Sequence, residues 1–264
     1  MGGLSVWREV RRRLPHESVV YLADGKNCPY GDRSKEEIAS LTRNAVVELI
    51  GRGAKLIVVA CNTATAVAID ALREEFDIPF VGMEPAVKPA ALATKTGTIG
   101  ILATRASLAG ELFRATSSKY ASDVNILSAV GEGFVEAVEG GLEATPGVRA
   151  NVEAVILPLV EAGADQIVLG CTHYPFLEDV MREVVGERGV TFVNPAPAVA
   201  RRVEWLLEQG DMLAPEEHKA EYSFVTFGGE KYLAQITEKA MEIAAKDENR
   251  QSNHLKQYGY KEES

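Results

Sequence analysis

The chain has 264 residues and a formal net charge of −10 at pH 7. This length can bury one large core or two of ordinary size, and the acidic charge argues against nucleic acid or an anionic membrane surface as partner. The sequence has neither an apolar run of ~20 residues nor a charged start followed by a signal-type apolar core, so we expect a cytoplasmic protein. Its three cysteines are an odd number in a chain too long to need disulfides, which favours reduced thiols.

The first third alternates helices with short apolar strands. A helical pattern opens the chain at Val6–Leu14 with no strand before it. Ser34 is a typical helix N-cap with Glu37 at the capping-box position, which predicts a helix running to about Gly51. Another helix is expected from Asn62 or Thr63 to about Phe76. The expected strands are Val19–Ala23, Leu56–Ala60 and Ile78–Gly82.

The remainder continues the alternation. Expected strands are 98–103, 124–127, 166–169 and 190–193, with a short edge strand at 222–227. Expected helices are 133–140, 147–162, one after Pro175, 196–207 and 231–245. Nearly every residue from 246 to 264 is polar or charged, so we expect this tail to be disordered.

Two stretches of the chain match one another. Residues 53–63 (GAKLIVVACNT) and 163–173 (GADQIVLGCTH) share Gly-Ala, Ile-Val and Cys in one register, and a proline follows each cysteine after 24 residues. Each apolar run is typical of a buried parallel strand. The repeat predicts an α/β fold of two pseudo-symmetric domains, each with a mostly parallel sheet flanked by helices. Their expected extents are 1–84 plus 194–245 for the first and 85–193 for the second, with 246–264 as the tail.

Cys61 and Cys171 each fall where a strand ends and a helix is expected to begin. Parallel sheets bind ligands at this edge, where the helix dipole and free N–H groups lower a thiol's pKa. Two such thiols from pseudo-symmetric halves suggest an acid and a base on opposite faces of one carbon, as a racemase needs. A disulfide, a metal pair or two buried inert cysteines are the alternatives. Only His173 lies close by as a further ligand, so no metal is expected.

Four motifs together resemble the bacterial glutamate racemases of the aspartate/glutamate racemase family. They are GGLSV at 2–6, CPYG at 28–31, CNTAT at 61–65 and GCTHYP at 170–175, and the similarity runs from Met1 to about Leu207. The resemblance implies a cofactor-independent two-thiol isomerase that makes D-glutamate for peptidoglycan. It further implies glutamate as substrate, an active site between two α/β domains, a cytoplasmic location and a homodimer.

Roles follow from the resemblance residue by residue. Cys61 is implied to take the α-proton from D-glutamate and Cys171 from L-glutamate, with Glu139 and His173 assisting Cys171. Without the family, Glu139 would be assigned to a solvated helix face shared with other glutamates. The implied substrate-binding residues, several of which could equally be turn or helix-cap residues, are Tyr30, Gly31, Asn62, Thr63, Thr104, Ser107, Thr172 and His173. Cys28 is interpreted as structural.

The opening of the chain departs from the family pattern. That pattern has an apolar strand, then Asp-Ser-Gly, Val or Ile and Gly-Gly-Leu, whereas this chain enters at Gly2-Gly3-Leu4. We therefore expect the first strand, the acid that assists Cys61 and a substrate-contacting serine to be missing. A second departure is Asp24–Asn27, where the family more often has Asp-Thr-Ala-Arg. Two alternatives stay open: a related racemase or decarboxylase of the same fold, or a weakly active or inactive racemase-fold protein that acts as a binding module.

Overall fold

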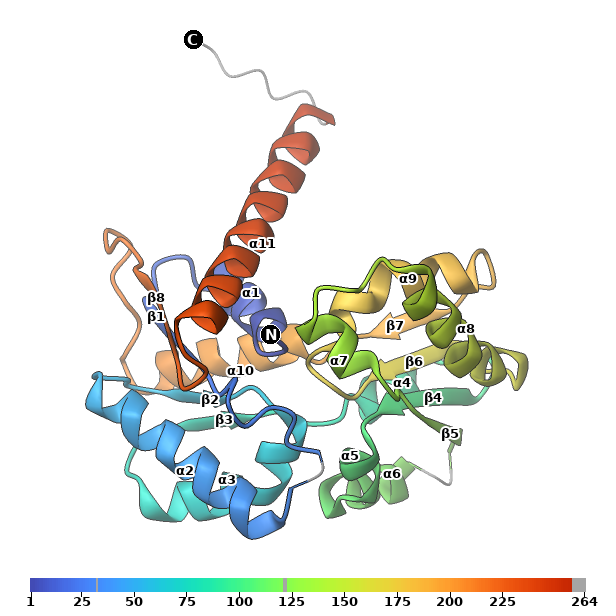
Figure 1. Cartoon of the computed structure of the whole chain (residues 1–264), viewed down its shortest axis with the longest axis horizontal. Helices are drawn as coiled ribbons and strands as arrows, with labels where there is room; N and C mark the ends of the chain where they lie inside the picture. Colours follow the sequence, from blue (N-terminus) through green and yellow to red (C-terminus); the bar gives the residue numbers. More distant parts are fainter. Residues whose placement is uncertain (32, 121–122, 258–264) are drawn as a thin grey trace.

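The computed structural model describes residues 1–31, 33–120 and 123–257. It has two α/β halves side by side, with the N-terminus between them (Figure 1). The described strands form three parallel sheets. The α/β fold class is confirmed.

The four-stranded sheet has the order β5-β4-β6-β7. Its strands are β4 (Thr98–Ala103), β5 (Asn125–Val130), β6 (Gln166–Leu169) and β7 (Thr191–Val193). The side chains of Ile99, Ile101 and Leu102 in β4 are fully buried, as are Ile167, Val168 and Leu169 in β6. Helices α8 (Pro146–Glu161) and α9 (Glu178–Val185) contribute to the core cluster on one side, and α4 (Val87–Ala93) to the other. This well-packed sheet carries the second cysteine at the end of β6.

The other two sheets have two strands each. Strand β1 (Val19–Ala23) pairs with β8 (Tyr222–Thr226), and β2 (Ile57–Val59) pairs with β3 (Phe80–Gly82). The predicted strands are therefore all present, including the edge strand β8. The remaining helical segments are α1 (Leu4–Arg13), α2 (Lys35–Gly51), α3 (Asn62–Glu75), α5 (Arg105–Ala109), α6 (Glu111–Tyr120), α7 (Phe134–Glu139), the 3₁₀ turn η1 (Tyr174–Leu177), α10 (Ala196–Gln209) and α11 (Glu230–Gln257). Helices α4, α5 and α6 were not among the expected elements.

The two matching stretches occupy equivalent places. Strand β2 leads through Cys61 and α3 to its neighbour β3, and β6 leads through Cys171 and α9 to its neighbour β7. Gly53 and Gly163, which begin the stretches, both have positive φ, of 84° and 96°. Glycine is needed at both turns because other residues rarely adopt this conformation.

A slot separates β1 from β2. Within the described residues each of these strands pairs on one edge only, and both end at the same cleft. Helix α2 covers one face of the slot, and α1 and α10 contribute to the other. Both strands line a cavity of about 860 Å³, which continues from the slot into the cleft between the two halves. A Cβ placed on Gly3 would lie 2.9 Å from the Tyr21 hydroxyl and 3.4 Å from the Ala60 Cβ, so the chain begins at the mouth of the slot.

The expectation of a disordered tail from residue 246 is wrong for residues 246–257. Helix α11 continues to Gln257 and projects away from the two halves (Figure 1). Asp247 is only 5% exposed and accepts hydrogen bonds from the Arg8 guanidinium, with Nε at 2.9 Å. A long-range charge pair therefore connects the start of this polar segment to α1. Residues 258–264 lie outside the described part of the chain.

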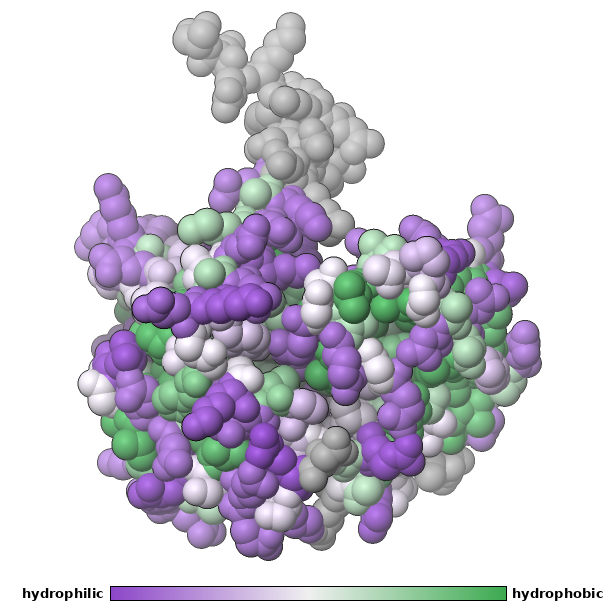
Figure 2. Space-filling view, in the orientation of Figure 1, coloured by the Kyte–Doolittle hydropathy of each residue, from purple (hydrophilic) through white to green (hydrophobic). Residues whose placement is uncertain are grey.

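The face of the molecule seen in Figure 1 is mixed in hydropathy. Figure 2 shows hydrophilic residues spread over this face, with hydrophobic residues between them on both halves. Among the described residues, no helix combines the length and the apolar character needed to cross a membrane.

Candidate active site

Cys61 caps the helix that follows the first cysteine strand. Its backbone is extended, and its Sγ accepts a hydrogen bond from the Ala64 N–H at 3.5 Å. Burial raises the pKa of the Cys61 thiol, while hydrogen bonds from the Ala64 and Thr63 backbones and the Thr63 side chain oppose the rise. The net result is a raised pKa, so Cys61 is a neutral thiol in the free protein.

Cys171 follows the second cysteine strand, and an imidazole lies beside it. His173 Nδ1 is 3.6 Å from Cys171 Sγ. Gly170 allows the backbone to pass close to β4, since a Cβ there would lie 2.8 Å from the Ala103 Cβ. Burial raises the pKa of Cys171 to about 12; the backbone N–H of His173 opposes this rise, and the nearby Cys61 adds to it.

The expectation that helix N-termini lower both thiol pKa values is wrong for this state of the protein. Both cysteines do lie at strand ends, and α3 does begin directly after Cys61. However, the cost of placing a charged thiolate in a buried site exceeds the stabilisation from the neighbouring N–H groups. Cys171 also lacks an adjacent α-helix start, because the 3₁₀ turn η1 precedes α9.

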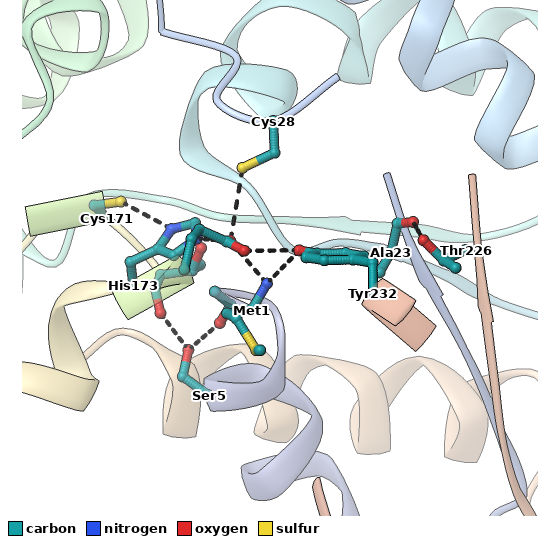
Figure 3. A network of polar contacts seen from close by, with 11 residues as sticks. Met1, Ser5, Ala23, Cys28, Cys171, His173, Thr226 and Tyr232 are labelled. Carbon is teal, nitrogen blue, oxygen red and sulfur yellow. Dashed lines mark hydrogen bonds and ion pairs between the residues drawn. The ribbon is translucent and has the colours of Figure 1, made fainter. Parts of the chain in front are cut away.

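Glu139 is the centre of a polar network rather than a member of a solvated helix face. It ends helix α7, and its Oε1 lies 2.6 Å from His173 Nε2. The Tyr232 hydroxyl donates to Oε2 at 2.8 Å, and the N-terminal ammonium of Met1 donates to Oε1 at 2.8 Å (Figure 3). Burial alone would raise the pKa of Glu139. The hydrogen bond from His173 and the Met1 ammonium outweigh it and lower the pKa to about 2.

Cys28 is a member of this network that the sequence did not indicate. The loop after β1 brings its thiol to 3.6 Å from Glu139 Oε1 (Figure 3). Burial and the Glu139 charge raise the pKa of Cys28 to about 12. Its position beside the Tyr30-Gly31 loop was the one available signal, but the contact crosses from one half of the molecule to the other.

The expected substrate-binding hydroxyls from the two halves meet across the cleft. Thr63 Oγ1 is 3.5 Å from Ser107 Oγ, which accepts a hydrogen bond from Thr104 Oγ1 at 2.9 Å. Thr104 is also the N-cap of α5, so the helix-cap interpretation of this residue is correct. Asn62 Nδ2 is buried and has no hydrogen-bond partner within the described part of the chain. A buried donor without a partner costs free energy, which makes it suited to an incoming acceptor.

The other expected residues surround the same space. The Tyr30 hydroxyl donates to Asp24 Oδ2 at 2.6 Å, and Gly31 lines the cavity beside it. The Thr172 carbonyl accepts from Ser5 Oγ at 2.9 Å. A Cβ on Gly2 would lie 2.6 Å from the His173 ring and 2.7 Å from Thr172 Oγ1, so only glycine fits there.

All the expected site residues line one cavity. It is the cavity of about 860 Å³ that continues into the slot, and Cys28 lines it too. Arg105 also reaches the cavity, but its guanidinium is paired with Glu132. The arrangement therefore offers two thiols, an imidazole held by a carboxylate, and neutral hydrogen-bond donors around one small-molecule-sized space.

Known proteins resemble the chain over most of its length. A profile described as Asp/Glu/Hydantoin racemase matches residues 5–203. A glutamate racemase from Herpetosiphon aurantiacus is 47% identical over 236 residues, which are 89% of this chain and 92% of that protein. The crystal structure of a glutamate racemase isoform from Bacillus anthracis has a TM-score of 0.81 and 33% identity, covering 91% of this chain and 90% of the other.

A further solved structure carries ligands. Escherichia coli glutamate racemase, in complex with L-glutamate and the activator UDP-MurNAc-ala, has a TM-score of 0.78 and 34% identity. The match covers 90% of this chain and 91% of that one. The extent of the family match and the identity to these relatives lead to one conclusion: the chain belongs to the Asp/Glu/hydantoin racemase family.

Proposed function

We propose that the protein is a cofactor-independent glutamate racemase that interconverts L- and D-glutamate with two thiols. The observation that carries the proposal is the placement of Cys61 and Cys171 at the ends of equivalent strands, on one cavity, from the two halves of the molecule. Relatives that are named glutamate racemase and match nearly the whole chain support glutamate as the substrate.

Each turnover moves one proton off the α-carbon and another one on. From L-glutamate, the Cys171 thiolate removes the α-proton, and the planar carbanion takes a proton from the Cys61 thiol on the opposite face. The reverse direction exchanges the roles of the two sulfurs. Since both free thiols have raised pKa values, one of them must lose its proton before chemistry.

The Glu139–His173 pair is suited to deprotonating Cys171. A carboxylate whose pKa is lowered to about 2 stays ionised at neutral pH and holds the proton of the imidazole on Nε2. Nδ1 then faces Cys171 Sγ as an acceptor at 3.6 Å. His173 and Glu139 are therefore assigned to activation of the L-glutamate side.

Neutral donors are assigned to the two substrate carboxylates. Asn62, Thr63, Ser107 and Thr172 all line the cavity, and the buried amide of Asn62 has no partner among the described residues. Several hydrogen bonds of this kind can strengthen together as charge develops on the carbanion. Tyr30 is assigned to positioning the loop, because its hydroxyl is held by Asp24.

We also infer that the slot between β1 and β2 is the place of the family's first strand. The slot has an unpaired strand edge on each side, apolar helices on its faces, and Gly3 at its mouth. Cys61 has hydrogen bonds from backbone groups and Thr63 but none from a carboxylate among the described residues. A strand ending in Asp-Ser-Gly would supply that carboxylate and a serine.

The wider role follows from the activity. We propose that the protein supplies D-glutamate for peptidoglycan, acts in the cytoplasm and forms a homodimer. The alternative is a racemase-fold binding module without turnover, which would be favoured if Cys61, without a carboxylate contact among the described residues, could not exchange its proton. Measured turnover separates the two.

The test replaces each thiol in turn. Cys61→Ser and Cys171→Ser should each lower racemisation roughly 10²- to 10⁴-fold, because a serine hydroxyl is a far weaker acid-base group than a thiol. Binding of glutamate should persist. Cys28→Ser removes a third thiol of the same cavity and is the matched control that should keep activity.

Circular dichroism of D- and L-glutamate follows the reaction in both directions. Near-parent racemisation by either the Cys61 or the Cys171 variant would refute the two-thiol proposal. Turnover of aspartate at a rate equal to that of glutamate would refute the assignment of substrate.

A further inference from the structure

Three side chains from three separate segments converge on the lining of the cavity. They are the thiol of Cys28, the carboxylate of Glu139 and the imidazole of His173. Each offers one ligand atom, and these atoms all lie within 4.8 Å of one another. Cys28 comes from the first half of the molecule, and the other two come from the second.

We propose that this cluster is a zinc-binding site that inhibits the enzyme when it is occupied. Sulfur, nitrogen and oxygen ligands of this kind are the set that Zn²⁺ prefers in proteins. The regulatory consequence rests on the proposed racemase function. The binding itself does not, because it depends only on the three ligand atoms.

One pair of ligand atoms already has the separation of a tetrahedral site, and a second pair is closer than such a site needs. Bonds to zinc of about 2.0–2.3 Å place pairs of ligand atoms roughly 3.3–3.8 Å apart. Cys28 Sγ and Glu139 Oε1 are already separated by 3.6 Å. His173 Nε2 lies 2.6 Å from Glu139 Oε1. A rotation of the ring or the carboxylate must therefore lengthen this separation by about 0.7 Å to reach the lower end of that range.

The surroundings of the cluster fit a bound cation. The Tyr232 hydroxyl donates to Glu139 Oε2 at 2.8 Å, which leaves Oε1 facing the other two ligands. Such a contact from a neighbouring residue orients a metal ligand. Oε1 already binds one cation, the Met1 ammonium at 2.8 Å, which the metal would replace. Substrate or water would take the fourth position.

Zinc bound at this site would stop turnover because two of its ligands, His173 and Glu139, take part in the proposed mechanism. Zinc on His173 Nε2 places the ring proton on Nδ1, so the imidazole can no longer accept a proton from Cys171 at 3.6 Å. A zinc ion between them would also break the hydrogen bond between Glu139 and His173. Because Cys28 lies in the other half, the metal would in addition tie the two halves together across the substrate cavity. Binding releases the Cys28 proton and forms the Zn–S bond, with no change in oxidation state.

Metal binding is measured first and without reference to activity. Titration of the full chain with ZnCl₂ by calorimetry should give one equivalent of tight binding. Co²⁺ in place of zinc should give the ultraviolet charge-transfer band of a cobalt–thiolate bond. In Cys28→Ser the affinity should fall at least 100-fold, and the cobalt band should disappear. His218→Ala removes an exposed imidazole that lines the same cavity but is not one of the three ligands, and it should leave both signals unchanged.

Inhibition is measured second. Zinc should lower racemisation of the parent protein in proportion to occupancy, a chelator should restore it, and Cys28→Ser should stay active in the same zinc concentration. Parent-like zinc affinity in Cys28→Ser would overturn the proposal and assign the metal to Cys61 or Cys171. Tight binding to the parent without loss of turnover would overturn the inhibitory role alone. A parent with no turnover but with a cobalt–thiolate band that needs Cys28 would contradict the racemase function and leave the metal site standing.

Discussion

An apolar strand of about five residues, joined to Met1 through Asp-Ser-Gly, should fill the slot between β1 and β2 and stabilise the protein. Five residues match the length of β1. The added strand would run parallel to β1 and β2, and Asp-Ser-Gly would connect it through Met1 to Gly3, which lies near Tyr21 and Ala60 at the mouth of the slot. It would unite the two small sheets in the order β8-β1-new strand-β2-β3.

The gain in stability can be estimated from the apolar burial and the hydrogen bonds that the slot would provide to the added strand. Burying five Val- or Ile-like side chains contributes ~7–15 kcal/mol, and ordering five residues costs about 6–10 kcal/mol. These terms nearly cancel. The hydrogen bonds to the unpaired edges of β1 and β2, each contributing about 0.5–1.5 kcal/mol, then leave a net gain of a few kcal/mol. A gain of about 3 kcal/mol corresponds to a rise of about 6 °C in the melting temperature of a chain this long.

The assay compares three proteins: the chain begun at Met1, the apolar extension, and a Gly-Ser extension of equal length. The Gly-Ser control also removes the Met1 ammonium from Glu139, so it separates loss of that charge from filling of the slot. We expect a higher melting temperature for the apolar extension alone. Turnover should rise as well, and more for D-glutamate, because the added Asp supports Cys61. Equal melting temperatures and equal turnover in the two extended proteins would refute our account of the slot.

Three further predictions concern particular residues. Gly2→Ala should lower turnover at least 10-fold, a loss of about 1.4 kcal/mol of transition-state stabilisation, because the added methyl group displaces the His173 ring; steady-state kinetics measures this. Asp247→Ala should lower the free energy of unfolding by about 2 kcal/mol in a denaturant titration, because it leaves the half-buried Arg8 guanidinium unpaired. The raised pKa of Cys171 predicts that kcat/KM for L-glutamate rises about 10-fold per unit between pH 6.5 and 8.5, since the thiolate fraction increases with pH well below a pKa of about 12.

Each prediction has its own control. Gly51→Ala adds a methyl group that meets nothing within 4 Å, so this control should keep the turnover of the parent protein. If Gly2→Ala also kept the parent turnover, the contact between residue 2 and the His173 ring would not constrain the ring. Glu248→Ala removes an exposed carboxylate and should change stability by less than about 0.5 kcal/mol. If Asp247→Ala changed the free energy of unfolding as little as Glu248→Ala, the Arg8–Asp247 pair would not fix α11 to α1. A flat pH profile would mean that Cys171 is ionised in the free enzyme.

Local patterns in the sequence were sufficient to predict the strands and the positions of Cys61 and Cys171 at strand ends. The short apolar runs before Cys61 and Cys171 are strands, and Ser34 accepts the hydrogen bond from the Glu37 N–H at 3.2 Å as the capping box predicts. These features depend on neighbours within a few residues. The positions of both thiols at one edge of their sheets follow from them.

The features that could not be predicted from the sequence depend on contacts between residues that are far apart in the chain. Cys28 and Glu139 are 111 positions apart, and no local pattern joins them. Arg8 and Asp247 are 239 positions apart, which is why the polar end of α11 was expected to be disordered. The pKa values of the two thiols are raised mainly by burial, which depends on the whole fold. The local pattern of a cysteine before a helix therefore predicted the wrong direction for these shifts.

The central claim is that two separate thiols act on opposite faces of one carbon, and racemisation in heavy water tests it most directly. Starting from either enantiomer, mass spectrometry of the first few per cent of product reports its hydrogen isotope at the α-carbon. With two bases, the product's new hydrogen comes from a thiol that has exchanged with solvent, so early product should be fully deuterated while recovered substrate keeps its protium. Early product that retains substantial protium would mean that one group carries the same hydrogen across both faces, and would contradict the account.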